Sequence, residues 1–524
     1  MYKLIYPTVN LFLYDLRDGL MQLGETIADN QVNFWRKIEP NIDRDYKRVQ
    51  EIYKHKDQIL SKSLKAEAEA LGEKILDNLK EFKDRENAEA DFVELHYQSF
   101  AEQQAYLDGM YYALQIGDTY ALQVEASDVT NAQEPAKRTD TPRSLDQLSR
   151  LQELVISKIN HHDRSPELDA DKLGTLGQTW LVWGQAVDGK TTENELRAIA
   201  KDYFSELTPD KSWKPDFKEV GELIGARVFE YAHNPKDWGN NKEKFLRENY
   251  HLVILLFPAD GTRPDVLRNR IAKITFDLIK LFAYRHKIIW SYWNSRHLKA
   301  ELKKKSQKIA ERKKQMAEYK QKNHNSLDKQ ALEVTKKKIY SRQSNLDNLE
   351  DNLKKSWLVL TEYESKLNQL QSQRQTIFIN LDNFKKRLAK IEEDAINQPA
   401  NLSAKLQILQ NKFINTAEER YLKQVQLDHT SLGADLTEIQ NLTRTLDSFV
   451  NIERTNATNR LNTTIAIAGL GLAASGAFAG IAATQVYPPA NKSDDGIPWI
   501  QGLGFSLIPL AIILSIWLCF KKKR

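Results

Sequence analysis

The sequence has little cysteine and little excess charge. Its only cysteine among 524 residues, Cys519, excludes an intramolecular disulfide framework and a Cys-based zinc site. The 76 basic and 71 acidic residues leave a net charge of +5, which gives no argument for nucleic acid as a partner. The first residues, MYKLIYPTVN, lack the basic, apolar and small-residue regions of a signal peptide. We therefore expect the bulk of the chain in the cytosol.

Two uncharged apolar runs near the C-terminus predict membrane spans, at about 463–486 and 498–520. Each run is long enough to cross an apolar layer of roughly 30 Å as a helix. The connection between them is short, and the basic residues 521–524 follow the second run. We predict a transmembrane hairpin over 461–524 with a basic cytosolic tail, in a multi-pass protein of the inner (plasma) membrane with both termini cytosolic.

The first predicted span is rich in small residues. Gly471 and Ser475 lie four apart, as do Gly476 and Gly480, and this spacing lets helix backbones approach closely. The pattern is compatible with an oligomer that places the first span around a central axis. It is equally compatible with a single anchor whose two helices pack on each other.

Polar residues precede the first span on one helical face. Asn456, Asn459 and Thr463 follow the spacing i, i+3, i+7. Around a symmetry axis their oxygen atoms would form stacked rings, which can replace part of an ion's hydration shell. We predict that these residues line a pore, although a polar face is also typical of a helix that is leaving water.

The run SFVNIERTNATNRLNTTIAIAGLGLAASGAFAGIAATQV, followed by a short loop, a second span and KKKR, resembles the membrane region of CorA-like divalent-cation transporters. The resemblance implies five subunits around one pore, contact with membrane lipid, and a divalent cation such as magnesium as transported or regulatory ion. Gln485 falls at the end of the triplet where the family has Gly-Met-Asn, and we predict it as pore-lining. Glu453 is predicted to form a ring that concentrates cations.

A long helical region precedes these spans. Leucines recur every seven residues from Leu346 to Leu388, with Arg374 as the exception, and mostly apolar residues follow each of those positions by three. This repeat predicts a coiled coil. Asn397-Gln398-Pro399 interrupts it, and a return helix leads toward the first span. We predict a long helical coiled-coil stalk over 291–460.

Residues 1–290 predict an α/β or α+β domain in the cytosol. Six β-branched or aromatic runs, beginning at Thr8, Phe92, Tyr120, Thr179, Ala226 and His251, are typical of strands between helical stretches. No nucleophile, base and acid can be assembled into a catalytic triad from the sequence.

One string in this domain matches a phosphate-binding loop. Gly184, Gly189, Lys190 and Thr191 fit G-x-x-x-x-G-K-[ST] between a predicted strand and a predicted helix, which makes them candidates for nucleotide binding. A structural interpretation competes, because Thr192 and Glu195 fit a helix capping box.

These patterns favour an oligomeric cation channel or transporter, gated by a cytosolic domain that binds an unknown ligand and acts through the stalk. A membrane-tethered effector in stress or phage defence is a rival interpretation. The other rivals are an anchored coiled-coil scaffold and a dynamin-like NTPase that depends on Lys190. We do not expect the protein to be an enzyme. We also do not expect it to bind nucleic acid.

Overall fold

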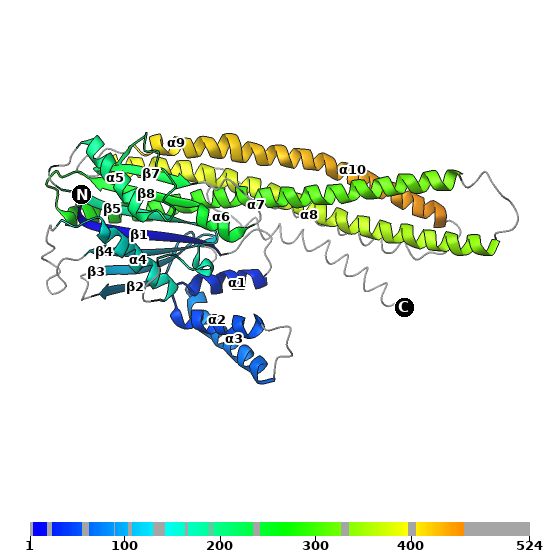
Figure 1. Ribbon diagram of the computed structural model, residues 1–524, viewed down its shortest axis with the longest axis horizontal. Coiled ribbons are helices and arrows are strands. Elements are labelled where there is room, and N and C mark those ends of the chain that lie inside the picture. Colours follow the sequence, from blue (N-terminus) through cyan, green and yellow to red (C-terminus); the bar gives the residue numbers. More distant parts are fainter. Residues whose placement is uncertain are drawn as a thin grey trace, which may run out of the picture. The chain divides into compact units, whose positions relative to one another are not determined.

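A computed structural model describes residues 4–17, 24–54, 62–87, 90–102, 107–128, 142–162, 166–187, 189, 192–233, 241–325, 335–396 and 405–454. The chain divides into two compact units that do not follow chain order. The sheet unit comprises residues 1–294 and 374–423, and the coil unit comprises 295–373 and 424–524. The helices α7 (Pro264–Asn325), α8 (Thr335–Ile396) and α10 (Lys423–Arg454) contribute residues to both units (Figure 1).

The sheet unit is built on one eight-stranded sheet with the order β2-β3-β4-β1-β5-β8-β7-β6. Its strands are β1 (Leu4–Leu16), β2 (Val93–Glu102), β3 (Leu107–Ile116), β4 (Thr119–Asp128), β5 (Gly177–Ala186), β6 (Gly221–Leu223), β7 (Ala226–His233) and β8 (Tyr250–Phe257). Only β5 and β8 pair in parallel, and the other neighbours are antiparallel.

The strand predictions are confirmed for all six apolar runs, because each coincides with a strand of this sheet. The sequence analysis missed β3, where Asp108 and Gly109 interrupt the apolar pattern, and β6, which has only three residues. The central strands β1, β5 and β8 are buried almost throughout. Near-continuous burial is expected for strands that are covered on both faces.

Helices cover both faces of the sheet, as neighbouring residues of β7 demonstrate. Tyr231 packs its ring edge-on against Phe204 of α5 (Glu193–Leu207), with centroids 4.5 Å apart. Glu230 instead accepts a hydrogen bond from Gln410 of α9 (Gln407–Asn415). Because successive strand residues point to opposite faces, α5 and α9 lie on opposite sides of the sheet. The first half of α7 lies on the α9 side, where Phe282 meets Phe12 of β1.

The remaining elements of the sheet unit are helical. They are α1 (Gly24–Trp35), α2 (Pro40–Lys54), α3 (Lys62–Lys83), α4 (Asp146–Asn160), η1 (Ala170–Lys172) and α6 (Lys242–Glu248). A π-helical segment, η2 (Thr416–Leu422), joins α9 to α10. π-helical turns are rare and occur frequently at functional sites.

The coil unit contains parts of α7, α8 and α10. Of the predicted heptad positions of α8 in this unit, those whose side chains the structure describes are buried, among them Leu353, Leu360, Leu367 and Leu370. The hydroxyl of Tyr363 donates to the carbonyl oxygen of Leu432 in α10 at 2.9 Å. The coiled-coil pattern is therefore confirmed in its packing. α8 ends at Ile396, directly before the predicted break at Asn397.

The predictions of a transmembrane hairpin and of a multi-pass integral membrane protein are corrected here. Among the described helices, none is long and apolar enough to cross a membrane. Even the longest, α7 and α8, carry charged residues along their length, so their apolar positions form stripes rather than uninterrupted runs. The segments from which the spans were predicted, 463–486 and 498–520, lie outside the described residues.

Candidate functional site

The residues predicted to line a pore lie at or beyond the end of the described chain. Glu453 belongs to the last turn of α10. Asn456, Asn459, Thr463 and Gln485 lie outside the described residues. Their proposed role stays a prediction.

The string that resembles a phosphate-binding loop is only partly described. Gly184 is a buried residue of β5, and Gly189 is exposed with a φ of 68°. Lys190 and Thr191 lie outside the described residues. The competing capping box is confirmed, because the hydroxyl oxygen of Thr192 accepts from the backbone N–H of Glu195, 3.4 Å away, while the Glu195 carboxylate accepts from the Thr192 backbone N–H. Nucleotide binding by this string stays a prediction.

A chain of buried polar side chains crosses the interface between the sheet and α7. Thr179 of β5 lies between two imidazoles, with its hydroxyl oxygen 2.9 Å from His251 Nδ1 and 2.8 Å from His286 Nε2. His251 Nε2 lies 2.9 Å from a carboxylate oxygen of Glu230. Thr179, His251 and His286 are almost completely buried. These residues come from β5, β7, β8 and α7, so only the fold brings them together.

The charge states of this chain fix the direction of its hydrogen bonds. Burial and the charge of Arg285 lower the pKa of His251 to about 4, so the ring is neutral near pH 7. Burial opposes ionisation of Glu230, but hydrogen bonding to His251 and the charge of Arg285 lower its pKa overall. His251 therefore donates from Nε2 and accepts from Thr179 at Nδ1, and His286 Nε2 donates to Thr179.

This assignment leaves His286 Nδ1 as a bare acceptor, and it has no partner among the described residues. Gly177 lies against it, since a Cβ there would approach Nδ1 to 2.3 Å. The φ of Gly177, 147°, is also one that other residues rarely adopt. A hydroxyl, an imidazole and a carboxylate are the members of a nucleophilic triad. The Thr179 hydroxyl is enclosed between two rings, however, so no substrate reaches it, and the chain of hydrogen bonds has a structural role.

A cavity of about 520 Å³ lies on the same sheet face, between β3, β4 and the first turns of α7. Its lining is mainly aromatic and apolar, and includes Phe92, Tyr97, Tyr112, Trp183 and Phe276. Small-molecule sites are typically cavities of this size with apolar walls and a few converging polar groups. This cavity has a size in that range and walls that are mainly apolar.

Three polar groups of this cavity stand out. The side-chain oxygen Oε1 of Gln123 and the indole N–H of Trp183 are both buried, and neither has a hydrogen-bond partner among the described residues. Buried polar atoms are rarely left without a partner, because the loss costs about 1–3 kcal/mol. Burial raises the pKa of Glu125, and the charge of Arg268 opposes that shift. Residues with an unpaired acceptor, an unpaired donor and a carboxyl group therefore border this cavity.

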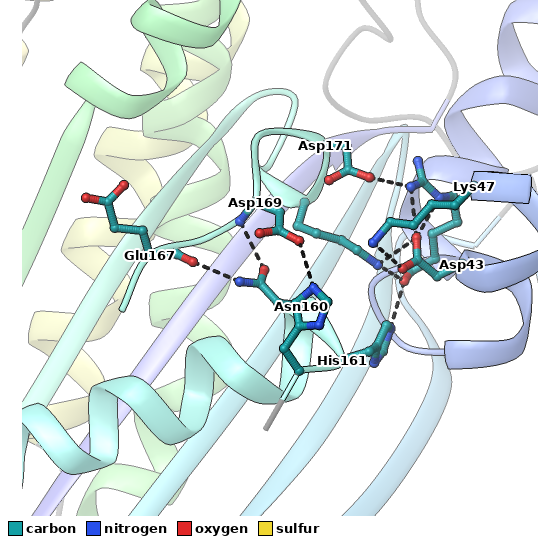
Figure 2. A network of polar contacts seen from close by, with 10 residues as sticks. Asp43, Lys47, Asn160, His161, Glu167, Asp169 and Asp171 are labelled. Atoms are coloured by element: carbon teal, nitrogen blue, oxygen red, sulfur yellow. Dashed lines mark hydrogen bonds and ion pairs between the residues drawn. The ribbon is translucent and has the colours of Figure 1, made fainter. Parts of the chain in front are cut away.

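A second polar cluster, shown in Figure 2, joins α2 to the segment after α4. The carboxylate oxygens of Asp43 lie close to three cationic side chains. The distance from an Asp43 oxygen is 3.0 Å to each of Arg36 Nε, Lys47 Nζ and Lys172 Nζ. Arg36 also pairs with Asp171, and Lys172 donates to the Arg36 carbonyl oxygen. Burial lowers the pKa of Lys172 to about 8, and Asp43 opposes that shift. Each charged side chain named here forms an ion pair with another member of the cluster.

The loop after α4 completes this cluster. The side chain of Asn160 donates to the carbonyl oxygen of Glu167 at 2.8 Å and accepts from the backbone N–H of Asp169 at 3.0 Å (Figure 2). His161, with a φ of 59°, places Nε2 2.9 Å from the Arg36 carbonyl oxygen. In the part of the chain that the structure describes, no group of three or more His, Cys, Asp or Glu side chains is arranged to hold a metal ion. The cluster has a structural role, because its contacts hold α2 and this loop together.

Comparison with known proteins finds no match to a protein-family model, a curated protein or a solved structure. The resemblance to CorA-like transporters and the expected pentamer therefore stay predictions. The candidate site is the cavity beside Gln123 and Trp183. The sequence analysis included Trp183 in a strand but did not identify it as a site residue.

Proposed function

We propose that the chain is a ligand-responsive regulatory protein whose sheet unit binds a small molecule in the cavity between β3, β4 and α7. One observation carries the proposal: Gln123 Oε1 and the Trp183 indole N–H are buried beside the cavity without hydrogen-bond partners. A ligand with a complementary donor and acceptor satisfies both groups and removes the cost of leaving them unpaired.

The chemistry of the lining selects the ligand class. Aromatic side chains, among them Tyr112 and Phe276, favour a flat ring system. Glu125 and Arg268 are the charged residues of the lining and have opposite signs, so the cavity has no excess charge that would favour an ion over an uncharged ligand. We therefore propose an uncharged heteroaromatic compound that carries both a donor and an acceptor.

The position of α7 supports a regulatory role. Arg268, Ile271 and Thr275 of α7 line the cavity, while the opposite wall belongs to the sheet. The same helix continues without interruption to Asn325, beyond the sheet unit. A ligand that contacts both walls favours one arrangement of α7 on the sheet, and differential binding of this kind shifts a conformational equilibrium.

A variant in which a larger side chain fills the cavity tests the proposal. Ala272 lies at the exposed edge of the cavity, so Ala272→Trp fills the opening without removing a buried side chain. The matched control is Ala70→Trp, at an exposed position of α3. A library of uncharged heteroaromatic metabolites is screened by thermal shift against the full-length chain.

We expect compounds that raise the melting temperature of the wild type and of Ala70→Trp but not of Ala272→Trp. The proposal is wrong if no compound in such a library stabilises the wild type. It is equally wrong if the stabilising compounds act on Ala272→Trp as strongly.

A further inference from the structure

A second cavity of about 410 Å³ lies on the other side of α7, among β7, α9 and η2. All of its lining residues belong to the sheet unit. It differs from the first cavity in its charge, because Arg285, Lys214, Lys218 and Lys412 line it. Its size is that of a small-molecule site, too small for a polymer.

Arg285 is the distinctive group of this cavity. Its side chain is 4% exposed, and its guanidinium carbon lies 4.2 Å from the centre of the Phe413 ring. Its Nε and Nη1 atoms are buried and have no hydrogen-bond partner among the described residues. A guanidinium has five N–H donors and always carries its charge, so unsatisfied donors in a buried position are unusual.

Glu230 holds Arg285 in place without satisfying it. The nearest carboxylate oxygen of Glu230 lies 3.6 Å from Arg285 Nη1, beyond hydrogen-bond distance. That carboxylate already accepts hydrogen bonds from His251 at 2.9 Å and Gln410 at 2.7 Å. The guanidinium is therefore oriented by an ion pair and by the Phe413 ring, with donors left over for a ligand.

The rim of the cavity carries three lysines. Lys214, Lys218 and Lys412 are exposed, and none of their ammonium groups forms an ion pair in the described part of the chain. The rim also carries Asp216 and Glu219, so the cavity is not uniformly positive. Four cationic groups from three segments nevertheless converge on one small space.

We propose that this second cavity binds the phosphate groups of a phosphorylated small molecule, with Arg285 as the buried anchor and Lys412, Lys214 and Lys218 as rim contacts. Arginine matches phosphate oxygens with its planar donors, and hydrogen bonds between two ionised partners are the strong ones. A group with two or more negative charges suits four converging cations better than a single carboxylate does.

The site also contacts the π-helical segment. Thr416, the first residue of η2, and Tyr421 line the cavity, and the Tyr421 ring stacks on Tyr292 of α7 at 4.2 Å. A phosphate held between Arg285 and Lys412 joins α7 to α9. The ligand therefore stabilises the packing of α9 and η2 on α7.

Calorimetric titration of the full-length chain with inorganic pyrophosphate at low salt tests this site. We expect one saturable site, an affinity loss of about 10-fold or more in Arg285→Gln, and a loss of about 3-fold in Lys412→Gln. The double variant Lys214→Gln/Lys412→Gln changes only exposed side chains, so it keeps the test valid if Arg285→Gln does not fold.

Lys201→Gln is the matched control, because it removes an exposed positive charge from α5 on the opposite face of the sheet. This control retains wild-type affinity. The site is refuted if the wild type shows no saturable binding, or if Lys201→Gln weakens binding as much as the rim double variant. Ala272→Trp retains pyrophosphate binding, which separates this result from the test of the first cavity.

Discussion

The two units bury different kinds of side chain. The sheet unit buries charged and imidazole groups, including Arg285, His286 and Lys172. The coil unit buries a seam of leucines on α8 and keeps ion pairs such as Lys305–Glu362 at its surface. One buried carboxylate in the coil unit, Asp428, is matched by two cations, Arg296 and Lys299.

Both cavities are lined by residues of the unit that buries these charged groups. Burying polar groups costs free energy unless each finds a partner, so an unpaired buried group that also borders a cavity is a candidate for contact with a ligand. Such groups border both cavities of the sheet unit. In the coil unit, apolar packing along the heptad repeat of α8 supplies stability.

The largest difference between the units is expected on removing a carboxylate. Asp43→Ala leaves Arg36 and Lys172 buried without their shared partner, and breaking a buried pair costs about 3–5 kcal/mol. Asp351→Ala removes an exposed partner of Lys355 in the coil unit, which costs about 0.5 kcal/mol. Urea denaturation of both variants gives the two values, and equal losses would contradict the comparison.

Shortening leucine side chains of α8 tests the comparison in the coil unit. Leu370 is fully buried in the seam, so Leu370→Ala lowers the free energy of unfolding by about 3 kcal/mol. Leu358 on the same helix is 65% exposed, and Leu358→Ala changes it by less than about 0.5 kcal/mol. The same denaturation experiment measures both. A similar loss for both variants would show that the leucine seam is not the packed core of the coil unit.

Acid should act on the sheet unit through its buried imidazoles. Because burial lowers the pKa of His251 to about 4, the unfolded chain binds a proton between about pH 6.5 and 4 that the folded chain does not. Lowering the pH through that window therefore reduces the free energy of unfolding, by up to roughly 3 kcal/mol from His251 alone.

Denaturation curves recorded from pH 7 to pH 4.5 check this sign. His251→Gln makes the dependence shallower. Stability that rises on acidification over this range would show that the His251 imidazole is not held neutral.

The smallest expected effect concerns the cap of α5. Thr192→Ala removes the hydroxyl that accepts from the Glu195 N–H, a loss of about 1 kcal/mol. Thr192→Ser keeps the hydroxyl and is expected to retain stability. Thermal denaturation distinguishes them, and identical melting temperatures for both variants would argue against the cap.

Local patterns in the sequence predicted local structure well. The six apolar runs became strands, the heptads of α8 became its buried seam, and Thr192 with Glu195 formed the capping box. The spacing of apolar residues determines such features within a few turns or pairs of residues. The transmembrane prediction, by contrast, was made from residues that the described helices do not include.

The candidate sites required the fold. Thr179, Glu230, His251 and His286 are separated by up to 107 residues, and no spacing rule connects them. The order of the strands brings them together, because β5 pairs with β8 and β8 with β7. The first cavity likewise needs β3, which the sequence analysis missed, and α7, whose first turns it did not place on the sheet.

The most direct test of the central claim is hydrogen–deuterium exchange of the full-length chain with the strongest ligand from the heteroaromatic library. We predict slower exchange in β4 around Gln123 and Glu125 and in α7 from Arg268 to Ile279, and no such protection in Ala272→Trp. Unchanged exchange in both segments, or protection confined to other parts of the chain, would contradict a ligand site between the sheet and α7.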